Sequence, residues 1–490
     1  MRDMNDHRHS VFGIVPPYIL DAISKNGTPD ERDIALQTLD RDLAIRSARP
    51  TFIEAPPPSR GLQNKRREVY NANHGTGLPG TLVRTEGQGP SGDVEVDEAY
   101  DGLGATFDLY WNAYNRNSVD DAGMTLIASV HYDQDYNNAE WNGQQMLFGD
   151  GDGQIFNRFT IAIDIIGHEL THGVTAYTAH LEYHDQPGAL NESISDVFGS
   201  LVKQYAATPQ QTADQADWLI GAGIFTSRIH GTALRSMKAP GTAFNDPLIG
   251  KDPQPAHMSN YDNTTDDNGG VHTNSGIPNH AFYLVATALG GYAWEKAGRI
   301  WYETLRDPHL TPTAQFQDFA NLTAANASRL FGDAAGQAVA NAWQQVGINV
   351  ATGTHRTPQV GGGGGQPFAD DLTGVKRLTK LTIRHGAYVD AIQCTWQMND
   401  GSSHTGAQHG GAGGRQDVIT FAADEYIVGV SGRAGAYVDQ LVIKTNKRTY
   451  GPYGGNGGKP FDLGPLAAHT TGFFGRSGRY LDALGAISVS

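Results

Sequence analysis

Apolar residues recur with helical spacing in several stretches of the chain. Residues 161–179, IAIDIIGHELTHGVTAYTA, form a long apolar run that is most simply explained as a buried helix. Residues 188–205, GALNESISDVFGSLVKQY, begin with a glycine and polar side chains and continue with apolar-periodic spacing, which predicts a second helix. Residues 30–48 carry a charged, amphipathic helix pattern, and a further helical pattern covers residues 96–115.

Short strand-like runs dominate residues 65–155, where β-branched and aromatic residues are bounded by Gly, Asn and Asp. Residues 156–348 are mostly helical in pattern. We therefore expect an α+β region of two lobes, with a β-rich lobe and the central helix at residues 65–180 and a helical lobe at residues 181–348. Substrates usually bind in a cleft between two such lobes.

An internal repeat begins near residue 360. Glycine clusters lie at residues 361–365, 410–414 and 454–458. A second motif, Gly-x-Tyr-x-Asp, recurs at nearly the same spacing, and its glycines and aspartates are Gly386, Asp390, Gly435, Asp439, Gly478 and Asp482. Three repeats of strand-like segments predict a threefold all-β architecture for residues 360–490.

These patterns make the protein multidomain, as a length of 490 residues also predicts. Residues 1–50 form a leading segment. Residues 51–64 are rich in proline and polar residues, so we expect an exposed linker there and place a cleavage within residues 44–64. Residues 65–348 form the two-lobed domain, and the polar residues 349–359 link it to the repeat domain.

Composition excludes several classes of partner. The net charge of −16, from 52 acidic and 36 basic residues, disfavours nucleic acid and anionic membranes, because phosphate binding needs a basic patch. The single cysteine, Cys394, rules out an intrachain disulfide. No apolar run approaches the roughly 20 residues of a membrane span. The first residues, MRDMNDHRHS, lead into no apolar core of a secretory signal.

The helix predicted at residues 161–179 contains the pattern His168-Glu169-x-x-His172. Residues four apart share one face of a helix, so both imidazoles can bind one metal ion, with Glu169 beside them. Zinc suits such ligands, and a catalytic zinc takes three protein ligands and keeps one position open for water. Two core histidines beside a helical glutamate are the alternative, which a third ligand would exclude.

The helix predicted at residues 188–205 offers Glu192 as that ligand, with Asp196 one turn further along the same face. A zinc-bound histidine usually donates its other N–H to a carboxylate or carbonyl oxygen. Asp196 is placed to accept it from His168, and Asn191 to accept it from His172. Helix-surface and capping roles are the alternatives for Asp196 and Asn191.

The HELTH motif followed by Asn191-Glu192-x-x-x-Asp196 resembles the zinc site of the thermolysin-like metallopeptidases. The resemblance continues in order along the two-lobed domain and implies further site residues. These are Asn138, Ala139 and Trp141 on an edge strand that pairs with substrate backbone, Tyr183 and His272 as oxyanion donors, Asp267 as the partner that orients His272, and Arg235 as the ligand of a substrate carbonyl.

The same residues suit the chemistry of amide hydrolysis. Zinc lowers the pKa of its water and polarises the carbonyl, and Glu169 would pass the water's proton to the leaving amine. His272 and Tyr183 would donate to the oxyanion, and Arg235 can hold a carbonyl with two N–H groups. A surface histidine and a half-buried loop tyrosine are the alternatives for His272 and Tyr183 taken singly.

Two apolar residues are candidates for a specificity pocket beside the zinc ion. Ile165 and Leu234 would favour a bulky apolar residue after the scissile bond, and plain core packing is the alternative. The calcium sites of the family need acids after the third zinc ligand. Lys203 stands at one aligned position, and a lysine cannot supply the oxygen that calcium requires, so we expect no double calcium site.

The leading segment contains Pro-Pro-Tyr-Ile-Leu ahead of the charged helix at residues 30–48. This arrangement resembles the short propeptide of the protealysin branch of the family. It implies a zymogen whose leader covers the cleft and is removed by self-cleavage. A helix that stays docked on the enzyme permanently is the alternative.

The repeat domain resembles the jacalin-related lectins, which fold as a β-prism of three four-stranded sheets. In that family a glycine-rich loop and a Gly-x-x-x-Asp loop together hold one hexose. The resemblance therefore implies that Asp482 pairs with residues 361–365, Asp390 with residues 410–414 and Asp439 with residues 454–458. The resemblance favours mannose-type sugars over galactose. Glycines that serve only as turns are the alternative for at least one site.

We expect a zinc endopeptidase made as a self-processed zymogen that acts on protein and peptide substrates, with a lectin domain that directs it to glycans. An extracellular destination by a route that reads no signal peptide is expected, and a cytoplasmic protein is the alternative. Two rival functions remain: a sugar-binding protein with a silent peptidase scaffold, and a lectin-like domain that binds no sugar and docks only on protein.

Overall fold

The computed structural model describes residues 13–48, 65–350, 354–372, 374–398, 401–423, 425–463 and 470–489. The expected cleavage linker at residues 51–64 and part of the expected linker at residues 349–359 lie outside the described residues. Backbone contacts divide the chain into one unit of residues 1–323 and 337–350 and a second of residues 324–336 and 351–490. Within the described ranges, no helix is long and apolar enough to cross a membrane.

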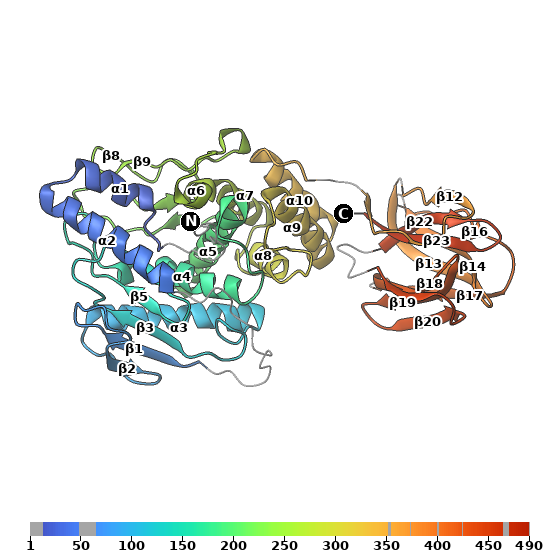
Figure 1. The fold of residues 1–490 in the computed structure, drawn as a ribbon, viewed down its shortest axis with the longest axis horizontal. Coiled ribbons are helices and arrows are strands. Elements are labelled where there is room, and N and C mark those ends of the chain that lie inside the picture. Colours follow the sequence, from blue (N-terminus) through green and yellow to red (C-terminus); the bar gives the residue numbers. More distant parts are fainter. Residues whose placement is uncertain are drawn as a thin grey trace, which may run out of the picture. The chain divides into compact units, whose positions relative to one another are not determined.

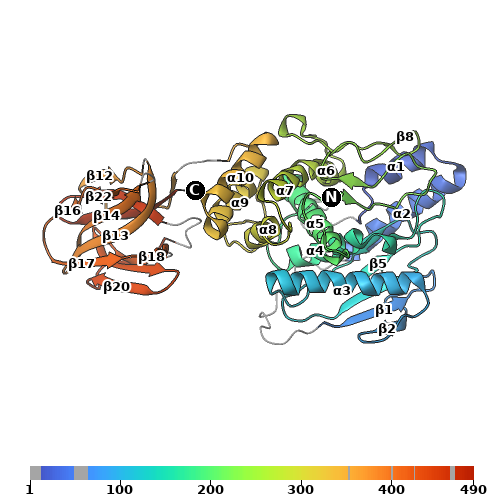
Figure 2. The ribbon, with the colours of Figure 1, turned by 180° about the vertical axis from the view of Figure 1, so that it is seen from behind.

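The first unit begins with a mixed sheet in the strand order β2-β1-β3-β5-β4. Its strands are β1 (Arg67–Asn71), β2 (Thr81–Thr85), β3 (Leu126–Val130), β4 (Ala139–Trp141) and β5 (Met146–Phe148). β1, β3 and β5 run parallel to one another, whereas β4 is an antiparallel edge strand. The long helix α3 (Val94–Tyr114) runs along this sheet in both views (Figures 1 and 2) and buries Val96, Leu103 and Phe107. β4 is therefore the last strand on one side of the sheet.

Helices make up most of the rest of the first unit. They are α4 (Ile163–Ala176), α5 (Asp185–Ala206), α6 (Asp267–Asn274), α7 (Gly276–Leu289), α8 (Ala297–Leu305), α9 (Phe316–Phe331) and α10 (Asp333–Gln345), and α9 and α10 extend into the second unit. Short pieces join them: η1 (Phe159–Ile161), η2 (Met258–Asn260), β6 (Leu219–Ile220), β7 (Arg235–Ser236), β8 (Asn245–Asp246) and β9 (Gly250–Lys251). The β-rich and helical lobes of the expected α+β fold are thus both present.

The two expected central helices differ from the prediction only at their ends. α4 stops at Ala176 because the N–H groups of Thr178 and His180 turn back to the carbonyl of Thr175. α5 starts at Asp185, three residues early, since Pro187 lies in the first turn, where a missing N–H costs no hydrogen bond.

Two glycines let α4 and α5 approach closely. A Cβ on Gly199 would lie 2.4 Å from the carbonyl oxygen of Asp164, and one on Gly167 would lie 3.1 Å from the Cα of Gly199. Larger residues here would push the helices apart. This contact places the α4 histidines next to the acidic residues of α5.

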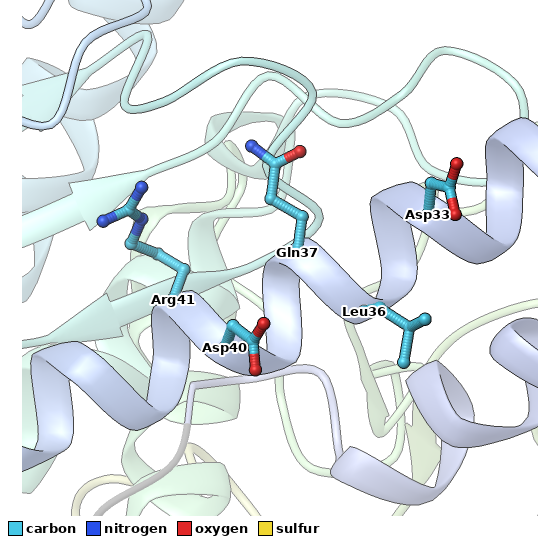
Figure 3. A pocket seen from close by; sticks show the side chains of 5 residues that line it. All are labelled: Asp33, Leu36, Gln37, Asp40 and Arg41. Carbon is cyan, nitrogen blue, oxygen red and sulfur yellow. The ribbon is translucent and has the colours of Figure 1, made fainter.

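The leading segment forms α1 (Pro17–Asn26) and α2 (Pro29–Ala48). Its first described residues are inserted deeply, and Ile14, Val15, Ile19 and Leu20 are 0–1% exposed. α2 contacts the segment between β3 and β4, where Nε of Arg41 donates a hydrogen bond to Oδ2 of Asp133. An open hollow on α2 is lined by Asp33, Leu36, Gln37, Asp40 and Arg41 (Figure 3), and it contains none of the predicted site residues.

The second unit contains three long antiparallel hairpins, β13–β14, β18–β19 and β22–β23. Each hairpin carries short strands along its edges, as the β-prism expectation requires. The strands are β10 (Thr354–Arg356), β11 (Val360–Gly361), β12 (Gln366–Ala369), β13 (Val375–His385), β14 (Val389–Met398), β15 (Ser403–Thr405), β16 (His409–Gly410), β17 (Arg415–Thr420), β18 (Ile427–Ala434), β19 (Val438–Thr445), β20 (Thr449–Gly454), β21 (Lys459–Asp462), β22 (Thr470–Ser477) and β23 (Leu481–Val489).

All three hairpins supply the core of this unit. Alternate residues of the long strands point inward, and they include Leu381, Ile383, Val430, Leu441 and Phe473. The outward positions are mostly polar or half-exposed. The internal repeat therefore corresponds to one hairpin group for each copy, and the all-β expectation is confirmed.

Candidate active site

The predicted zinc ligands converge between α4 and α5. His168, His172 and Glu192 are 0–2% exposed. The Nε2 atoms of the two histidines lie 3.0 Å apart. Oε2 of Glu192 lies 3.5 Å from Nε2 of His168, and Oε1 of Glu192 lies 3.4 Å from Nε2 of His172. Ligand atoms about 2.0–2.2 Å from a tetrahedral zinc stand at nearly these separations.

An orphaned oxygen supports a metal at this point. Oε2 of Glu192 is buried and has no hydrogen-bond partner among the residues described. An unpaired buried carboxylate oxygen is costly, and a cation coordinated there removes the cost. The donor set of two imidazoles and one carboxylate suits zinc.

The outward nitrogens of both histidines are held by α5. Nδ1 of His168 lies 2.8 Å from Oδ1 of Asp196, and Nδ1 of His172 lies 2.8 Å from Oδ1 of Asn191. An N–H donated outward leaves each Nε2 with its lone pair toward the metal position. The sequence prediction placed Asp196 and Asn191 in these two positions.

Arg235 fixes the position of Asp196, the hydrogen-bond partner of His168. Its Nε and Nη2 each donate to Asp196 at 2.8 Å, and Nδ2 of Asn279 donates to the same residue at 2.8 Å. Burial alone would raise the pKa of Asp196, but the Arg235 charge and the His168 hydrogen bond hold it well below its usual range. Asn279 was missed at the sequence level because it lies on α7, far along the chain.

The predicted oxyanion donors lie beside Glu192. Tyr183 donates to Oε1 of Glu192 in a short hydrogen bond, and its hydroxyl lies 3.4 Å from Nε2 of His272. Nδ1 of His272 lies 2.8 Å from Oδ1 of Asp267. Burial lowers the pKa of His272, but the neighbouring Asp267 and Glu192 carboxylates outweigh it and raise the value overall.

Local backbone geometry aims His272. Asn268, Gly269 and Gly270 all have positive φ, so the chain turns sharply after Asp267. The N–H of His272 returns to Oδ2 of Asp267 at 3.0 Å. Asp267 thus holds both the backbone and the ring of His272.

Glu169 connects the metal position to the edge strand. It is completely buried, and its Oε2 accepts the backbone N–H of Trp141 at 2.9 Å. Ile165 and Leu234 are also completely buried, and Leu234 packs against Gly221. Their role in a specificity pocket stays a prediction.

The leading segment forms hydrogen bonds with residues that the sequence analysis expects to bind substrate. The N–H of Ile14 donates to the carbonyl of Ala139 at 3.0 Å, and the N–H of Val15 donates to Oδ1 of Asn138 at 2.9 Å. Nη1 of Arg235 donates to the carbonyl of Ile14 at 3.1 Å. All three are the groups that the family resemblance assigns to substrate.

In the second unit, each repeat aspartate lies against its expected glycine loop. Asp390, Asp439 and Asp482 are only 5–6% exposed. A Cβ on Gly364 would lie 2.3 Å from Oδ1 of Asp482, and equivalent contacts pair Gly413 with Asp390 and Gly457 with Asp439. No side chain fits between these glycines and the carboxylates. The motif glycines Gly386, Gly435 and Gly478 are all exposed.

An arginine in each repeat was missed at the sequence level. Arg384, Arg433 and Arg476 each stand six residues before the aspartate and donate through Nε to a glycine-loop carbonyl at 2.9, 2.8 and 2.7 Å. Because each arginine precedes its aspartate by six residues, the sequence alone could have identified them as part of the repeat. These arginines clamp the glycine loops from the hairpin side.

Comparisons with known proteins agree with this geometry. Residues 60–176 match the thermolysin metallopeptidase catalytic domain, residues 179–348 its alpha-helical domain, and residues 12–40 the protealysin propeptide. An extracellular metalloprotease of Pectobacterium carotovorum is 53% identical over 342 residues, which cover 69% of this chain and 97% of the relative. The chain belongs to the thermolysin family of metallopeptidases.

Further relatives place this thermolysin-family peptidase near protealysin. Protease PrtS of Photorhabdus is 51% identical over 71% of this chain and 95% of its own length. The solved precursor of protealysin from Serratia proteamaculans is 55% identical, with a TM-score of 0.63 over 69% of this chain and all of its own. Residues 357–487 match the jacalin-like lectin domain. The predicted family, fold class and enzyme class are thereby confirmed.

Lys203, the residue on which the sequence analysis bases the expected lack of a double calcium site, lies among oxygen atoms. Nζ of Lys203 lies 3.1 Å from Oδ2 of Asp164, 2.8 Å from Oδ2 of Asp217 and 3.3 Å from the carbonyl of Leu219. Burial raises the pKa of Asp164 despite the Lys203 charge, which acts to lower it. The ammonium group thus sits among the oxygens that a cation would use.

Proposed function

We propose that this chain is a zinc endopeptidase, made as a zymogen blocked by its own leading segment, whose C-terminal domain binds mannose-type glycans. The observation that carries the proposal is the backbone of Ile14 and Val15 on Ala139, Asn138 and Arg235. A segment that uses these groups excludes substrate backbone from them.

The side chains suit hydrolysis of a peptide bond. His168, His172 and Glu192 would hold a zinc ion, which would supply a Lewis acid for the carbonyl and lower the pKa of a water molecule. Glu169 accepts the proton of that water and delivers it to the leaving nitrogen. The Trp141 N–H on Oε2 of Glu169 orients the carboxylate toward the edge strand.

Charge that develops on the scissile oxygen meets two donors. Tyr183 and His272 stand 3.4 Å apart beside the metal position, and both can donate to one oxyanion. Asp267 favours the protonated, donating form of His272, since it raises the pKa of that imidazole. Removal of one such donor typically slows turnover about 100–1,000-fold.

We further propose that the enzyme cleaves on the N-terminal side of bulky apolar residues. The support is the complete burial of two apolar side chains, Ile165 on α4 and Leu234 directly before β7. Digestion of a peptide library followed by mass spectrometry tests this specificity. Cleavage with no preference after the scissile bond would refute it.

Self-processing has a direct test. Full-length protein is incubated with and without a zinc chelator, beside a Glu169→Ala variant, and chain mass is followed over time. We expect only the untreated wild type to shorten, by cleavage within residues 44–64, and then to hydrolyse casein. If wild type and variant stay equally intact with zinc bound, the zymogen proposal fails.

The three aspartate sites support a trivalent lectin. The rings of Tyr388, Tyr437 and Tyr480 contact one another pairwise with centroids 5.3 Å apart, so the three loops surround one axis. Sites gathered at one end of the domain can bind a branched glycan through several sugars at once, which raises avidity. Galactose and the absence of any sugar binding are the alternatives.

A glycan array with full-length Glu169→Ala protein tests the lectin proposal. We expect high-mannose glycans to be bound, and binding to fall stepwise as Asp390, Asp439 and Asp482 are each changed to Asn. Preference for galactose would refute the sugar assignment. Binding that survives the triple variant would refute the sites.

We infer an extracellular destination, supported by relatives named extracellular metalloproteases. We also propose that the double calcium site is absent, supported by Lys203 among its oxygens. Assay of peptidase activity in the culture medium and in the cell lysate distinguishes export from a cytoplasmic protein.

A further inference from the structure

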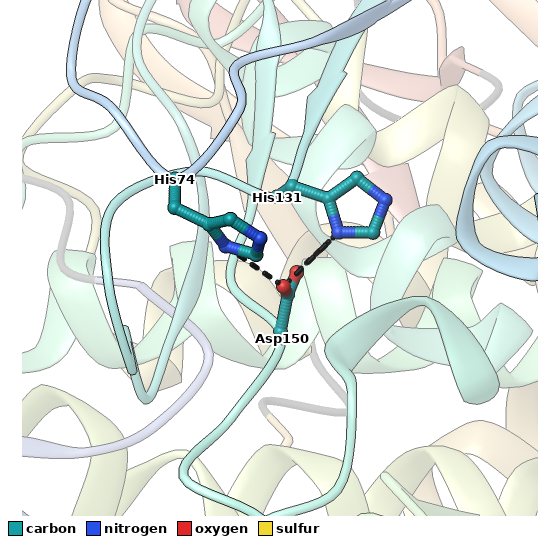
Figure 4. Close-up of side chains that lie close together, drawn as sticks. All are labelled: His74, His131 and Asp150. Carbon is teal, nitrogen blue, oxygen red and sulfur yellow. Dashed lines mark hydrogen bonds and ion pairs between the residues drawn. The ribbon is translucent and has the colours of Figure 1, made fainter.

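A second group of metal-ligand side chains lies at the end of the sheet in the first unit. His74 follows β1, His131 follows β3 directly, and Asp150 follows β5. Because these three strands are parallel neighbours, their carboxyl ends meet at one edge of the sheet. Figure 4 shows the three side chains pointing toward one another.

The distances within this group are short. Nδ1 of His131 lies 3.0 Å from both carboxylate oxygens of Asp150, and Nδ1 of His74 lies 3.3 Å from Oδ2 of Asp150. One ligand atom from each of the three residues lies within 4.8 Å of the others. The N–H of His74 also donates to the carbonyl of His131 at 2.9 Å, which fixes the two loops together.

A fourth side chain points into the group from α3. Glu95 is 8% exposed, and its Oε2 has no hydrogen-bond partner in the part of the chain that the structure describes. That oxygen lies 3.6 Å from Nδ1 of His131. A buried carboxylate oxygen without a partner is costly unless a cation or proton joins it.

Asp93 orients His131 from behind. Its Oδ2 lies 2.9 Å from Nε2 of His131, while its Oδ1 caps α3 by accepting the backbone N–H groups of Glu95 and Val96. A carboxylate that accepts one ring N–H leaves the other nitrogen, Nδ1, as a ligand. This arrangement repeats the relation of Asp196 to His168 at the catalytic zinc position.

We propose that His74, His131, Asp150 and Glu95 form a second metal site that binds a divalent first-row transition ion such as Zn²⁺. Two imidazoles and two carboxylates suit these ions, whereas calcium and magnesium prefer all-oxygen sites. None of the four residues belongs to the catalytic group.

The site would stabilise the loop that carries the substrate edge. Residues 131–138 join β3 to β4, and within them Asp133 bonds Arg41 of the leader and Tyr136 bonds Asp42. An ion that fixes His131 therefore holds the start of this loop. We expect its removal to loosen both the edge strand and the docked leader.

Protons are the competitor of the ion. With no ion, Asp150 raises the pKa of His131 to about 9, and burial together with Asp150 raises that of Glu95 to about 8. A doubly protonated His131 and a protonated Glu95 would then satisfy the same contacts. Metal counting separates the two states.

The experiment uses the full-length Glu169→Ala protein, which cannot process itself. The protein is stripped with a chelator, reloaded with Zn²⁺, freed of excess ion by gel filtration and assayed for zinc by mass spectrometry. We expect two zinc ions for each chain. We expect one in a further His74→Ala variant, and one in a His172→Ala variant, which loses the catalytic ion instead.

His230→Ala is the matched control, because His230 is an exposed histidine that pairs with a single carboxylate, Asp246. It should keep both ions. A parent protein whose one ion is lost in His172→Ala but kept in His74→Ala, or an equal loss in His230→Ala and His74→Ala, overturns the proposal. Failure of the catalytic zinc proposal gives a different result, since His172→Ala would then change nothing.

Asp93→Asn measures the orienting role. Asparagine also caps helices well, so α3 should remain intact while the carboxylate partner of His131 is lost. We expect the dissociation constant of the second zinc ion to rise about 10–100-fold. An unchanged constant, with α3 intact by circular dichroism, would overturn the orienting role of Asp93.

Discussion

The block of the cleft by the leader can be tested at Gly13. A Cβ at this position would lie 2.5 Å from the carbonyl oxygen of Ala139 and 2.6 Å from the side chain of Asn138. The first of these neighbours is backbone, which cannot move aside as a flexible side chain would. Gly13→Ala should therefore lift the segment off the edge strand.

The expected magnitude follows from the hydrogen bonds at risk. Ile14 and Val15 each donate one backbone N–H to the enzyme, and Arg235 donates to the carbonyl of Ile14. Two neutral bonds at about 1 kcal/mol each and one charged bond at about 1.5–3 kcal/mol total about 3.5–5 kcal/mol. The lower figure corresponds to a roughly 300-fold weaker occupation of the cleft.

The assay measures hydrolysis of a fluorogenic peptide by freshly prepared, unprocessed chains whose mass is checked at once. Gly13→Ala should be more active than wild type before processing and should process faster. Lys25→Ala is the control, since Lys25 is largely exposed and pairs with Asp21 of its own helix. Equal initial activity and equal half-life in all three proteins would refute the leader block.

Four further predictions follow from individual contacts. Arg228 donates to Glu31 of the leader and lowers the pKa of that carboxyl. This pair stabilises docking above the ordinary glutamate pKa and loses its effect as pH falls through the lowered value. The protection of α2 backbone amides against hydrogen exchange, relative to their intrinsic rate, should therefore fall on acidification of Glu169→Ala protein, and should fall less when Glu31→Gln is added. Asp196→Asn should weaken zinc binding about 10–100-fold in chelator competition, because it removes the carboxylate partner of His168. Lys203→Met should reduce the free energy of unfolding by about 3–5 kcal/mol and so lower the melting temperature, since Asp164 is 1% exposed and would be left as a buried unpaired charge. Added calcium should not raise the melting temperature of the wild type. Arg433→Met should weaken mannan binding without unfolding the domain, because Arg433 holds the carbonyls of Gly457 and Gly458; unchanged binding would show that the clamp is dispensable.

Several features of the protein follow from the sequence alone because they depend on local spacing. His168 and His172 share a helix face because residues four apart on a helix always do, and Asp196 follows Glu192 by one turn of α5. The threefold β domain is visible in the repeated Gly-x-Tyr-x-Asp motif, since each copy builds the same hairpin. Motif order along the chain therefore sufficed for the family and the fold class.

Contacts between distant segments were decided only by the tertiary structure. Gly167 and Gly199 set how closely α4 and α5 pack, and no local pattern predicts that approach. Asn279 reaches Asp196 from α7, and Ile14 contacts Arg235, which lies 221 residues further along the sequence. The group of His74, His131 and Asp150 is likewise invisible in the sequence, because only the pairing of three parallel strands brings their following loops to one edge.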